Sequence, residues 1–295
     1  MITMDDLLWP HFQPLWRDLV AASSTNILVA GGYGLFLKQR WLTSSESLPT
    51  VVPISNWLDT TPRVTKDVDL VLGLDLIKDA SHQKSVVSAL TQNGFEASDR
   101  ESEQRWKFLK RLSGDQLIVV EMHAQRPDPD LDGITATDKR VKHKPSLGEQ
   151  GVHGRTNPEA VGSELHPFQF SLDDVKLVVP NPVTWSVMKL TATRDRWVSS
   201  QDLARDEESR EFNRLQAAKH AQDVYRVIAM MTMEERDRVS EVVESLIGTS
   251  AFNTAKQCWQ KDFGDNPIPV VRELGAKWQP GDEANIRGVL SGWFG

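Results

Sequence analysis

Two aspartates, Asp67 and Asp69, stand one residue apart at the start of a short apolar run that ends at Leu72. Successive side chains of a β-strand point to opposite faces, so both carboxylates would lie on one face and Val68 and Leu70 on the other. Neighbouring carboxylates repel each other, and a hard divalent cation such as Mg²⁺ or Mn²⁺ would relieve that repulsion. The pair therefore predicts a metal site. An exposed strand end with two solvated acids is the alternative.

A double glycine, Gly31-Gly32, follows the apolar run 26–30, which is short enough for a buried strand, and precedes residues 35–41, which read as a helix. Glycine lets the backbone approach a ligand closely, and the first N–H groups of a helix are free to bind phosphate. The two glycines therefore predict a phosphate contact, although an ordinary turn would use the same residues.

A third acid, Glu121, lies near the end of the strongly apolar run 117–123. An acid in such a strand is costly without a partner, and a metal ion shared with Asp67 and Asp69 would be one. A salt bridge at the end of the strand is the alternative. His123 falls on the same face as Glu121 and could touch the site, where we expect it to be a hydrogen-bonded neighbour.

The order of these features resembles the nucleotidyltransferase superfamily with its polymerase-beta-like core. The glycine pair comes first, then Arg63-x-Thr65-Lys66-Asp67-Val68-Asp69, then a carboxylate on a later strand. The chain looks most similar to the minimal bacterial nucleotidyltransferases that include toxin components of type IV abortive-infection systems. The resemblance covers roughly residues 26–72 and 178–228. It departs from the family pattern where Glu121 replaces the commoner Asp and where a long loop precedes the aspartates.

The resemblance also implies roles for residues of the second half of the chain. Lys189 lies in the segment 182–190, and Lys219 opens a Lys-x-x-x-Asp motif that ends at Asp223. Both lysines would act as point charges that face a nucleoside triphosphate. Lys219 and Asp223 are also four residues apart on a helix, so an ordinary surface salt bridge is the alternative for them.

Three further residues belong to the candidate site. Thr65 is part of the nucleotide-binding stretch that the resemblance implies. Arg63 and Arg194 are weaker candidates, which we expect to be structural.

The elements expected around these residues predict an α+β fold. A nucleotidyltransferase-like domain at 1–180, with a mixed β-sheet and flanking helices, precedes a helical domain at 181–295 that begins at Pro182 with Asn181 as its cap. We expect a long loop at about 125–166, where periodicity is weak. The first domain is expected to contain helices at 14–22 and 82–93, the second ended by Gly94, strands at 68–72 and 168–179, and a hairpin of strands 106–112 and 117–123.

Composition limits the class of protein. The net charge of −7 excludes a protein that coats nucleic acid, but it allows a local basic groove. The basic run 139–144 could meet an acceptor's phosphates, although we expect a solvated loop. Cys258 is the single cysteine, so no disulfide framework or cysteine zinc site is possible, and no apolar run approaches the ~20 residues of a membrane span. We expect a cytoplasmic protein with no membrane partner.

The expected reaction is transfer of a nucleoside monophosphate from an NTP such as ATP to an acceptor hydroxyl, with release of pyrophosphate. Asp67 and Asp69 would hold the metal of the triphosphate, and Glu121 would help to hold a second ion near the acceptor. RNA or tRNA, a protein and a small molecule are all open as acceptors, and the resemblance adds a cognate antitoxin as a possible partner. A metal-dependent glycosyltransferase and a catalytically silent binding module are the alternatives.

Overall fold

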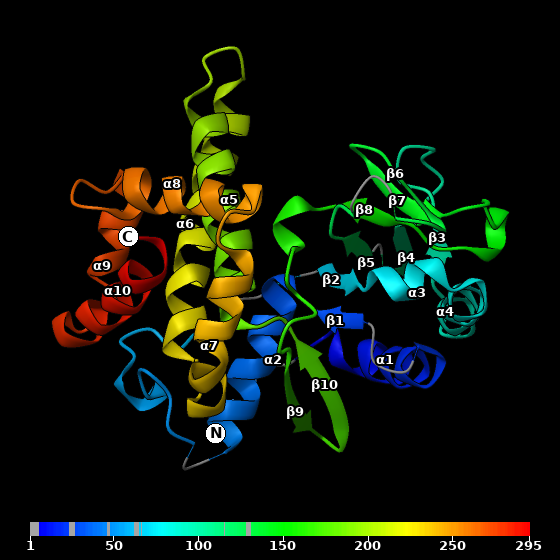
Figure 1. Cartoon of the computed structure of the whole chain (residues 1–295), viewed down its shortest axis with the longest axis horizontal. Coiled ribbons are helices and arrows are strands. Elements are labelled where there is room, and N and C mark those ends of the chain that lie inside the picture. The colour runs from blue at the N-terminus through cyan, green and yellow to red at the C-terminus, as the bar shows by residue number, and fades with distance from the viewer. Residues whose placement is uncertain are drawn as a thin grey trace. The chain divides into compact units, whose positions relative to one another are not determined.

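The computed structural model describes residues 6–23, 27–45, 48–61, 65, 67–114, 116–127 and 131–295. These residues form two compact units, a mixed α/β unit and a helical one (Figure 1). The first unit consists of Met1–Gly34, Arg63–Ala160 and Gln169–Val179. The second consists of Leu35–Pro62, Val161–Phe168 and Pro180–Gly295. The boundary expected at 180/181 stays a prediction.

A mixed sheet of eight strands, counted over the described residues, is the centre of the first unit. The strands are β1 (Ile27–Val29), β2 (Asp67–Leu72), β3 (Glu96–Ala97), β4 (Lys107–Arg111), β5 (Leu117–Ala124), β6 (Ile134–Ala136), β7 (Arg140–His143) and β8 (Gly154–Thr156). Their order is β1-β2-β5-β8-β7-β6, with β4 beside β5 and β3 beside β4. β2 and β8 run parallel to β5, whereas β4 runs antiparallel to it.

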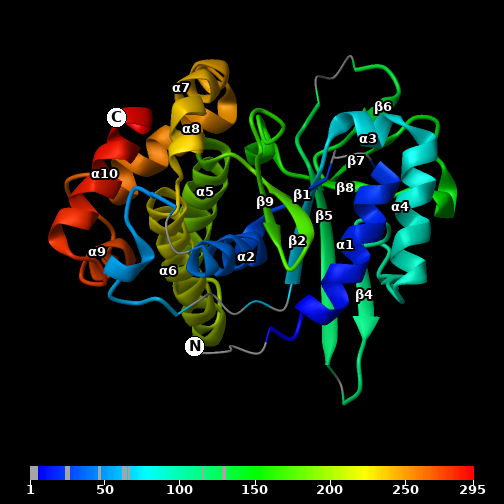
Figure 2. The same cartoon turned by 90° about the horizontal axis from the view of Figure 1, so that it is seen from below.

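The central strand β5 separates a buried face from a more open one. Ile118, Val120, Met122 and Ala124 are buried, and the residues that alternate with them are half-buried or exposed. Helices α1 (Trp9–Ser23) and α4 (Ala80–Gln92) lie side by side along the sheet (Figure 2). The carboxylates predicted to carry chemistry are on the open face, because they occupy the other set of alternating positions.

Local sequence signals account for the ends of helix α4, which follows the short helix α3 (Leu74–Lys78). The Asp79 side chain caps α4 by accepting hydrogen bonds from the backbone N–H groups of Ser81 at 2.7 Å and His82 at 2.9 Å. Gly94 follows the last turn with a φ of +75°, a left-handed conformation that favours glycine. The expected stop at Gly94 is therefore confirmed.

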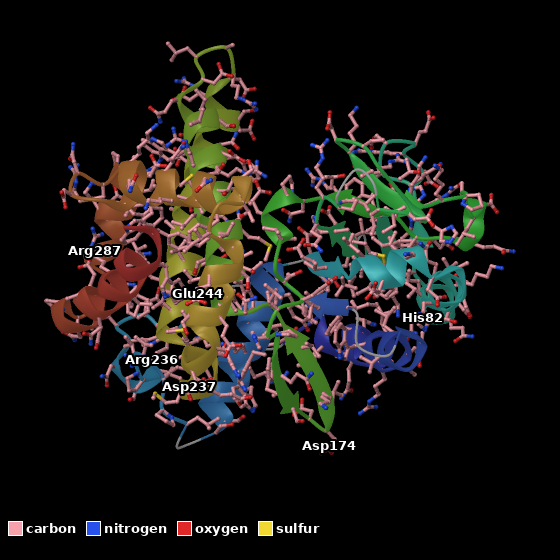
Figure 3. The ribbon with its side chains drawn as sticks, viewed as in Figure 1. His82, Asp174, Arg236, Asp237, Glu244 and Arg287 are labelled. Carbon is pink, nitrogen blue, oxygen red and sulfur yellow. The ribbon has the colours of Figure 1, made fainter. Side chains whose placement is uncertain are left out.

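A separate two-stranded hairpin completes the first unit. Strands β9 (Phe168–Leu172) and β10 (Val175–Val179) are joined by Asp173 and Asp174. Both aspartates have positive φ, 48° and 60°, which is the backbone of a two-residue hairpin turn. Figure 3 shows Asp174 at the tip of this hairpin.

The segment 125–166, expected as a long loop, instead supplies β6, β7 and β8 and two short 3₁₀ turns, η2 (Gly148–Gln150) and η3 (Pro158–Ala160). The expectation was wrong because these strands are too short to show alternation. Each buries a single side chain or glycine, namely Ile134, Val141 and Gly154. Only β8 pairs with the far end of β5, while β7 pairs with β8 and β6 pairs with β7. The position of all three strands in the sheet thus depends on the non-local pairing of β8, which leaves no periodic signal in the sequence.

The second unit is helical apart from its linking segments. Helix α2 (Gly31–Ser44) begins in the first unit, and its residues from Leu35 on belong to the second. The other helices are η1 (Ile54–Asn56), α5 (Pro182–Gln201), α6 (Glu207–Ala229), α7 (Met233–Leu246), α8 (Ser250–Cys258), the π-helical η4 (Trp259–Phe263), α9 (Pro269–Gly275) and α10 (Pro280–Phe294). In both views α5 and α6 run along each other (Figures 1 and 2).

Polar caps begin the main helices of this unit. The Asn181 side chain accepts a hydrogen bond of 2.8 Å from the Thr184 N–H, and Pro182 follows it, as predicted. Thr232 and Glu235 form a reciprocal capping box at the start of α7. Across the described residues, no helix combines the length and apolarity that a membrane crossing requires. The α+β class, with a mixed sheet, flanking helices and a helical part, is confirmed.

Candidate metal centre

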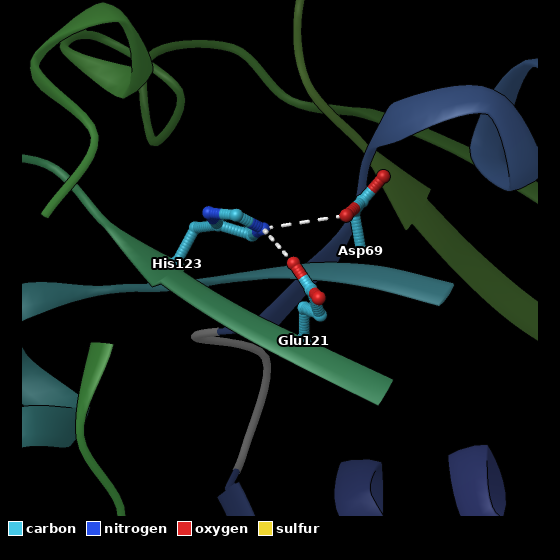
Figure 4. Close-up of side chains that lie close together, drawn as sticks. All are labelled: Asp69, Glu121 and His123. Atoms are coloured by element: carbon cyan, nitrogen blue, oxygen red, sulfur yellow. Dashed lines mark hydrogen bonds and ion pairs between the residues drawn. The ribbon is translucent and has the colours of Figure 1, made fainter. Parts of the chain in front are cut away.

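Strands β2 and β5 bring two carboxylates together on the open face of the sheet. Asp69 and Glu121 are direct partners in the parallel register of these strands. His123 is two residues further along β5 and therefore points to the same face as Glu121. Figure 4 shows the three side chains converging on one point above the sheet.

The geometry of this group suits a metal ion. His123 Nε2 lies 3.3 Å from Asp69 Oδ1 and 3.9 Å from Glu121 Oε2. One ligand atom from each of the three residues lies within 4.8 Å of the other two. Solvent reaches all three side chains, which are 32%, 18% and 14% exposed for Asp69, Glu121 and His123. Carboxylate oxygens and an imidazole nitrogen are ordinary metal ligands, so this group can hold a divalent ion.

Gly31 forms one wall of the group. Its φ is +62°, and a Cβ at this position would lie 1.8 Å from Asp69 Oδ2. The backbone here is tied to the same strand, since Ala30 N–H donates to the Asp69 carbonyl at 2.8 Å. Gly31 is the first residue of helix α2, so the expected strand-to-helix turn is in fact the first turn of that helix, in which Gly32 is buried. Only glycine fits this position, because the Asp69 carboxylate occupies the space of a side chain.

Two basic residues also contact Glu121. Lys107 Nζ lies 3.1 Å from Glu121 Oε1, and Arg155 Nη1 lies 3.9 Å from Glu121 Oε2. Lys107 is the partner of Glu121 in the β4–β5 ladder, and the Arg155 guanidinium lies 5.4 Å from the centre of the Trp106 ring. Glu121 is therefore a member of the metal-compatible group and also part of a salt bridge, the two roles that the sequence left open.

Asp67 and Thr65 lie beside this group. Asp67 is exposed at the start of β2, in register with Val119, and it is not one of the three residues whose ligand atoms converge. The Thr65 hydroxyl donates to the Asp67 carbonyl at 3.2 Å and accepts from the Asp67 N–H at 3.3 Å. Thr65 therefore orders the backbone that leads into β2. Arg63 is outside the described residues.

The basic candidates of the helical unit have neighbours of their own. Lys189 Nζ lies 2.8 Å from Asp223 Oδ2, and both side chains are buried between α5 and α6. Lys219 is exposed on α6. Arg194 Nη1 contacts both carboxylate oxygens of Asp262, at 3.2 and 3.0 Å. The roles of Lys189, Lys219, Arg194 and Asp223 toward a nucleotide stay predictions.

The basic run 139–144, expected as a solvated loop, is largely strand β7, because that strand pairs with β8. Arg140 is the register partner of Arg155, which is in turn the partner of His123. Cross-strand partners share a face, so Arg140 and Arg155 lie on the open face with His123, and Lys142 follows at the next position on that side. Lys107 could have been found by pairing the hairpin residues, but no sequence signal leads to Arg155.

Comparisons with known proteins add little. No protein-family model matches the chain, and no curated protein matches it. Among solved structures it is similar to an antigenic nucleotidyltransferase-like protein from Paracoccidioides brasiliensis. That similarity has 15% identity and a TM-score of 0.31, over 79% of this chain and 88% of the other.

Proposed function

We propose that the protein is a metal-dependent nucleotidyltransferase, which moves a nucleoside monophosphate from an NTP to an acceptor hydroxyl and releases pyrophosphate. The observation that supports it most is the arrangement around Asp69. This carboxylate is paired in register with Glu121 on a parallel strand, and it is packed against a glycine at the start of a helix. Acids that could hold a metal and the first residues of a helix, whose N–H groups could bind a phosphate, are thus next to each other.

Each residue has a part in the proposed reaction. Asp69 and Glu121, with Asp67 at the strand end, would hold Mg²⁺ or Mn²⁺, which stabilises charge on the attacking and leaving oxygens when bound. The N–H groups at Gly31 and Gly32 would orient a phosphate of the nucleotide. Thr65 would keep the Asp67 backbone in place.

The lysines of the helical unit belong to the same proposal. Lys189 and Lys219 would offset charge on the β- and γ-phosphates. For Lys189 this requires an exchange, because its ammonium is already beside the Asp223 carboxylate at 2.8 Å. The exposed Lys219 needs no such exchange.

The acceptor that this face favours is polyanionic. Arg155, Arg140 and Lys142 follow one another on the side of the sheet that carries Glu121 and His123. A row of cations on a protein of net charge −7 is a local basic surface of the kind that binds phosphodiester backbones. We therefore propose that the acceptor is RNA, with tRNA among the candidates, rather than a protein. A role as the toxin of a toxin–antitoxin pair is part of this proposal.

A catalytically silent nucleotide-binding module is the second candidate. The Lys107 ammonium lies 3.1 Å from Glu121, and a cation so close competes with a metal ion for that carboxylate. Such a protein would bind nucleotide without metal-dependent turnover.

Labelled NTPs decide between these functions. The protein is incubated with each NTP, Mg²⁺ or Mn²⁺ and total RNA, and label is followed into RNA, protein and small molecules. We expect label in RNA with release of pyrophosphate, and loss of transfer in Asp69→Asn. Asp75→Asn, an exposed acid on α3, is the matched control and should transfer like wild type. Binding of NTP without transfer would support the silent module, and release of a nucleoside diphosphate would identify a glycosyltransferase.

A further inference from the structure

His123 places a nitrogen atom where a metal ion would contact the two carboxylates. Its Nε2 is 3.3 Å from Asp69 Oδ1 and 3.9 Å from Glu121 Oε2, and the ring's other nitrogen is on the far side (Figure 4). The side chain is 14% exposed, so its ring is held by its surroundings and still reached by solvent. A hydrogen bond to Asp69 would explain the first distance alone, but not why the same nitrogen also faces Glu121.

The type of this donor determines which ion the group prefers. Mg²⁺ binds oxygen and keeps several waters, whereas imidazole nitrogen suits transition metals. Two carboxylates with one imidazole fit Mn²⁺, which accepts both kinds of ligand. Gly31 is a second observation at the same place, because its missing side chain leaves the Asp69 carboxylate its room.

We propose that His123 is the third protein ligand of the metal, with Asp69 and Glu121, and that the site therefore binds Mn²⁺ more tightly than Mg²⁺. This inference rests on the site of the proposed function, but it concerns metal binding by the protein without nucleotide. In the protein without nucleotide, His123 then takes the place of Asp67, which is outside the converging group, as the third ligand.

The contact between Lys107 and Glu121 bears on the same affinity. For an ion to reach Glu121, the Lys107 ammonium must move away from 3.1 Å. Lysine has a long flexible side chain, and this one is 23% exposed, so it can turn to solvent. Removal of that charge should therefore tighten metal binding, which a purely structural His123–Asp69 hydrogen bond does not predict.

The test measures the metal alone on the full chain. Mn²⁺ is titrated by electron paramagnetic resonance and calorimetry, with Mg²⁺ as competitor. Pulsed resonance then looks for the coupling of imidazole nitrogen to bound Mn²⁺. We expect wild type to prefer Mn²⁺ by about tenfold or more and to show the nitrogen coupling. His123→Gln should lose most of that preference and the coupling, while Mg²⁺ affinity changes little. His82→Gln, on α4, is the control and should behave as wild type.

Three results would overturn the inference: no Mn²⁺ binding by wild type, bound Mn²⁺ without nitrogen coupling, or an equal ion preference in wild type and His123→Gln. The coupling is measured on wild type, so the test holds even if the variant does not fold. Mn²⁺ bound with nitrogen coupling, in a protein that transfers no nucleotide, would leave the inference standing while the proposed function fails. Transfer with equal use of both ions and no coupling would do the reverse.

Discussion

Two groups of charged residues in this protein differ in what they can still bind. On the sheet, the side chains of Asp69, Glu121 and His123 are reached by solvent, and their contacts include Lys107 with Glu121 at 3.1 Å and His123 with Asp69 at 3.3 Å. In the helical unit, Lys189 and Asp223 lie 2.8 Å apart and are 7% and 1% exposed. The first group can exchange a partner for an ion at small cost. The second would have to leave a charge without its partner inside the protein, which is far more costly.

A second buried lysine of the helical unit also lies beside a carboxylate. Lys38 Nζ and Glu235 Oε1 are 2.6 Å apart, and both side chains are buried in the helical unit. Burial lowers the pKa of Lys38, and the charge of Glu235 offsets part of that shift. Glu235 also accepts hydrogen bonds from the Thr232 N–H and hydroxyl at the start of α7. Both of these buried lysines thus have a carboxylate partner inside the unit, whereas the acids of the sheet are partly exposed.

The largest effect is expected from breaking the buried pair of Lys189 and Asp223. Asp223→Leu removes the carboxylate and leaves the Lys189 charge buried, which should lower the free energy of unfolding by about 3–5 kcal/mol. Urea denaturation measures it. Adding Lys189→Met should restore much of the loss, because the buried charge is then gone as well.

An exposed pair supplies the control for this experiment. Arg214 and Glu211 are 2.8 Å apart but 45% and 50% exposed, so water screens their attraction and Glu211→Gln should change the free energy of unfolding very little. If Asp223→Leu cost no more than Glu211→Gln, the contrast between buried pairs and open groups would be wrong.

Gly31 should give the next largest effect, and the chain contains its control. Gly31→Ala meets a left-handed backbone and also the Asp69 carboxylate, 1.8 Å from the new Cβ. Gly148 has a similar φ of +61° with nothing within 4 Å of a Cβ, so Gly148→Ala carries only the backbone cost of about 1–2 kcal/mol. We expect Gly31→Ala to be the more destabilising and to weaken Mn²⁺ binding. Equal losses in the two variants would mean that Asp69 moves freely away from the glycine.

Variants of Glu121 and Lys107 distinguish two roles of Glu121, that of a metal ligand and that of a salt-bridge partner. Glu121→Gln removes the charge that would hold an ion, so turnover should fall at least about tenfold while NTP binding persists. Lys107→Gln removes the competing cation and should strengthen metal binding. A salt bridge without a catalytic part predicts a lower melting temperature in both variants and activity near that of wild type. Assays at several metal concentrations are needed, because excess ion can rescue a weakened site.

The contrast also explains what the sequence could and could not predict. Alternation along 67–72 and 117–123 places Asp69, Glu121 and His123 on the open face, where their side chains do lie close together. Alternation also placed Asp67 there, but Asp67 is not part of the converging group. Gly94 and Asn181 were predicted correctly, because a helix stop and a helix cap are local signals. Such features depend on a few consecutive residues, which a single sequence displays.

The sequence could not predict which residues of different helices and strands contact each other. For Asp223, a salt bridge with Lys219 one turn away was the alternative to a role toward the nucleotide, and neither interpretation led to its contact with Lys189 of another helix. Arg155 reaches Glu121 only because the short strand β8 pairs with the end of β5. Periodicity tells which side of an element a residue is on, but not which element lies there.

The smallest effect expected is a pH dependence from His153, next to strand β8. This histidine is buried, and its pKa is lowered from 6.5 to about 4 by burial and then by the nearby charges of Arg105, Arg140 and Lys142. The unfolded chain takes up this proton below pH 6.5, whereas the folded protein takes it up only near pH 4. Folding stability from His153 is therefore intact above pH 6.5 and declines as the pH falls toward 4.

His11 has a lowered pKa as well and acts in the same direction, so the His153 variant must be compared with wild type at each pH. His153→Gln should make the melting temperature less sensitive to pH between 6.5 and 4, and the same change at the half-buried His82 should have much less effect. A polyanion bound along Arg140 and Lys142 would screen their positive charges and so raise the pKa of His153 toward its ordinary value. Short RNA added at low salt should therefore also make the melting temperature less sensitive to pH. If the RNA had no effect while His153→Gln did, the cations Arg155, Arg140 and Lys142 would be a feature of the fold rather than the binding surface of an acceptor.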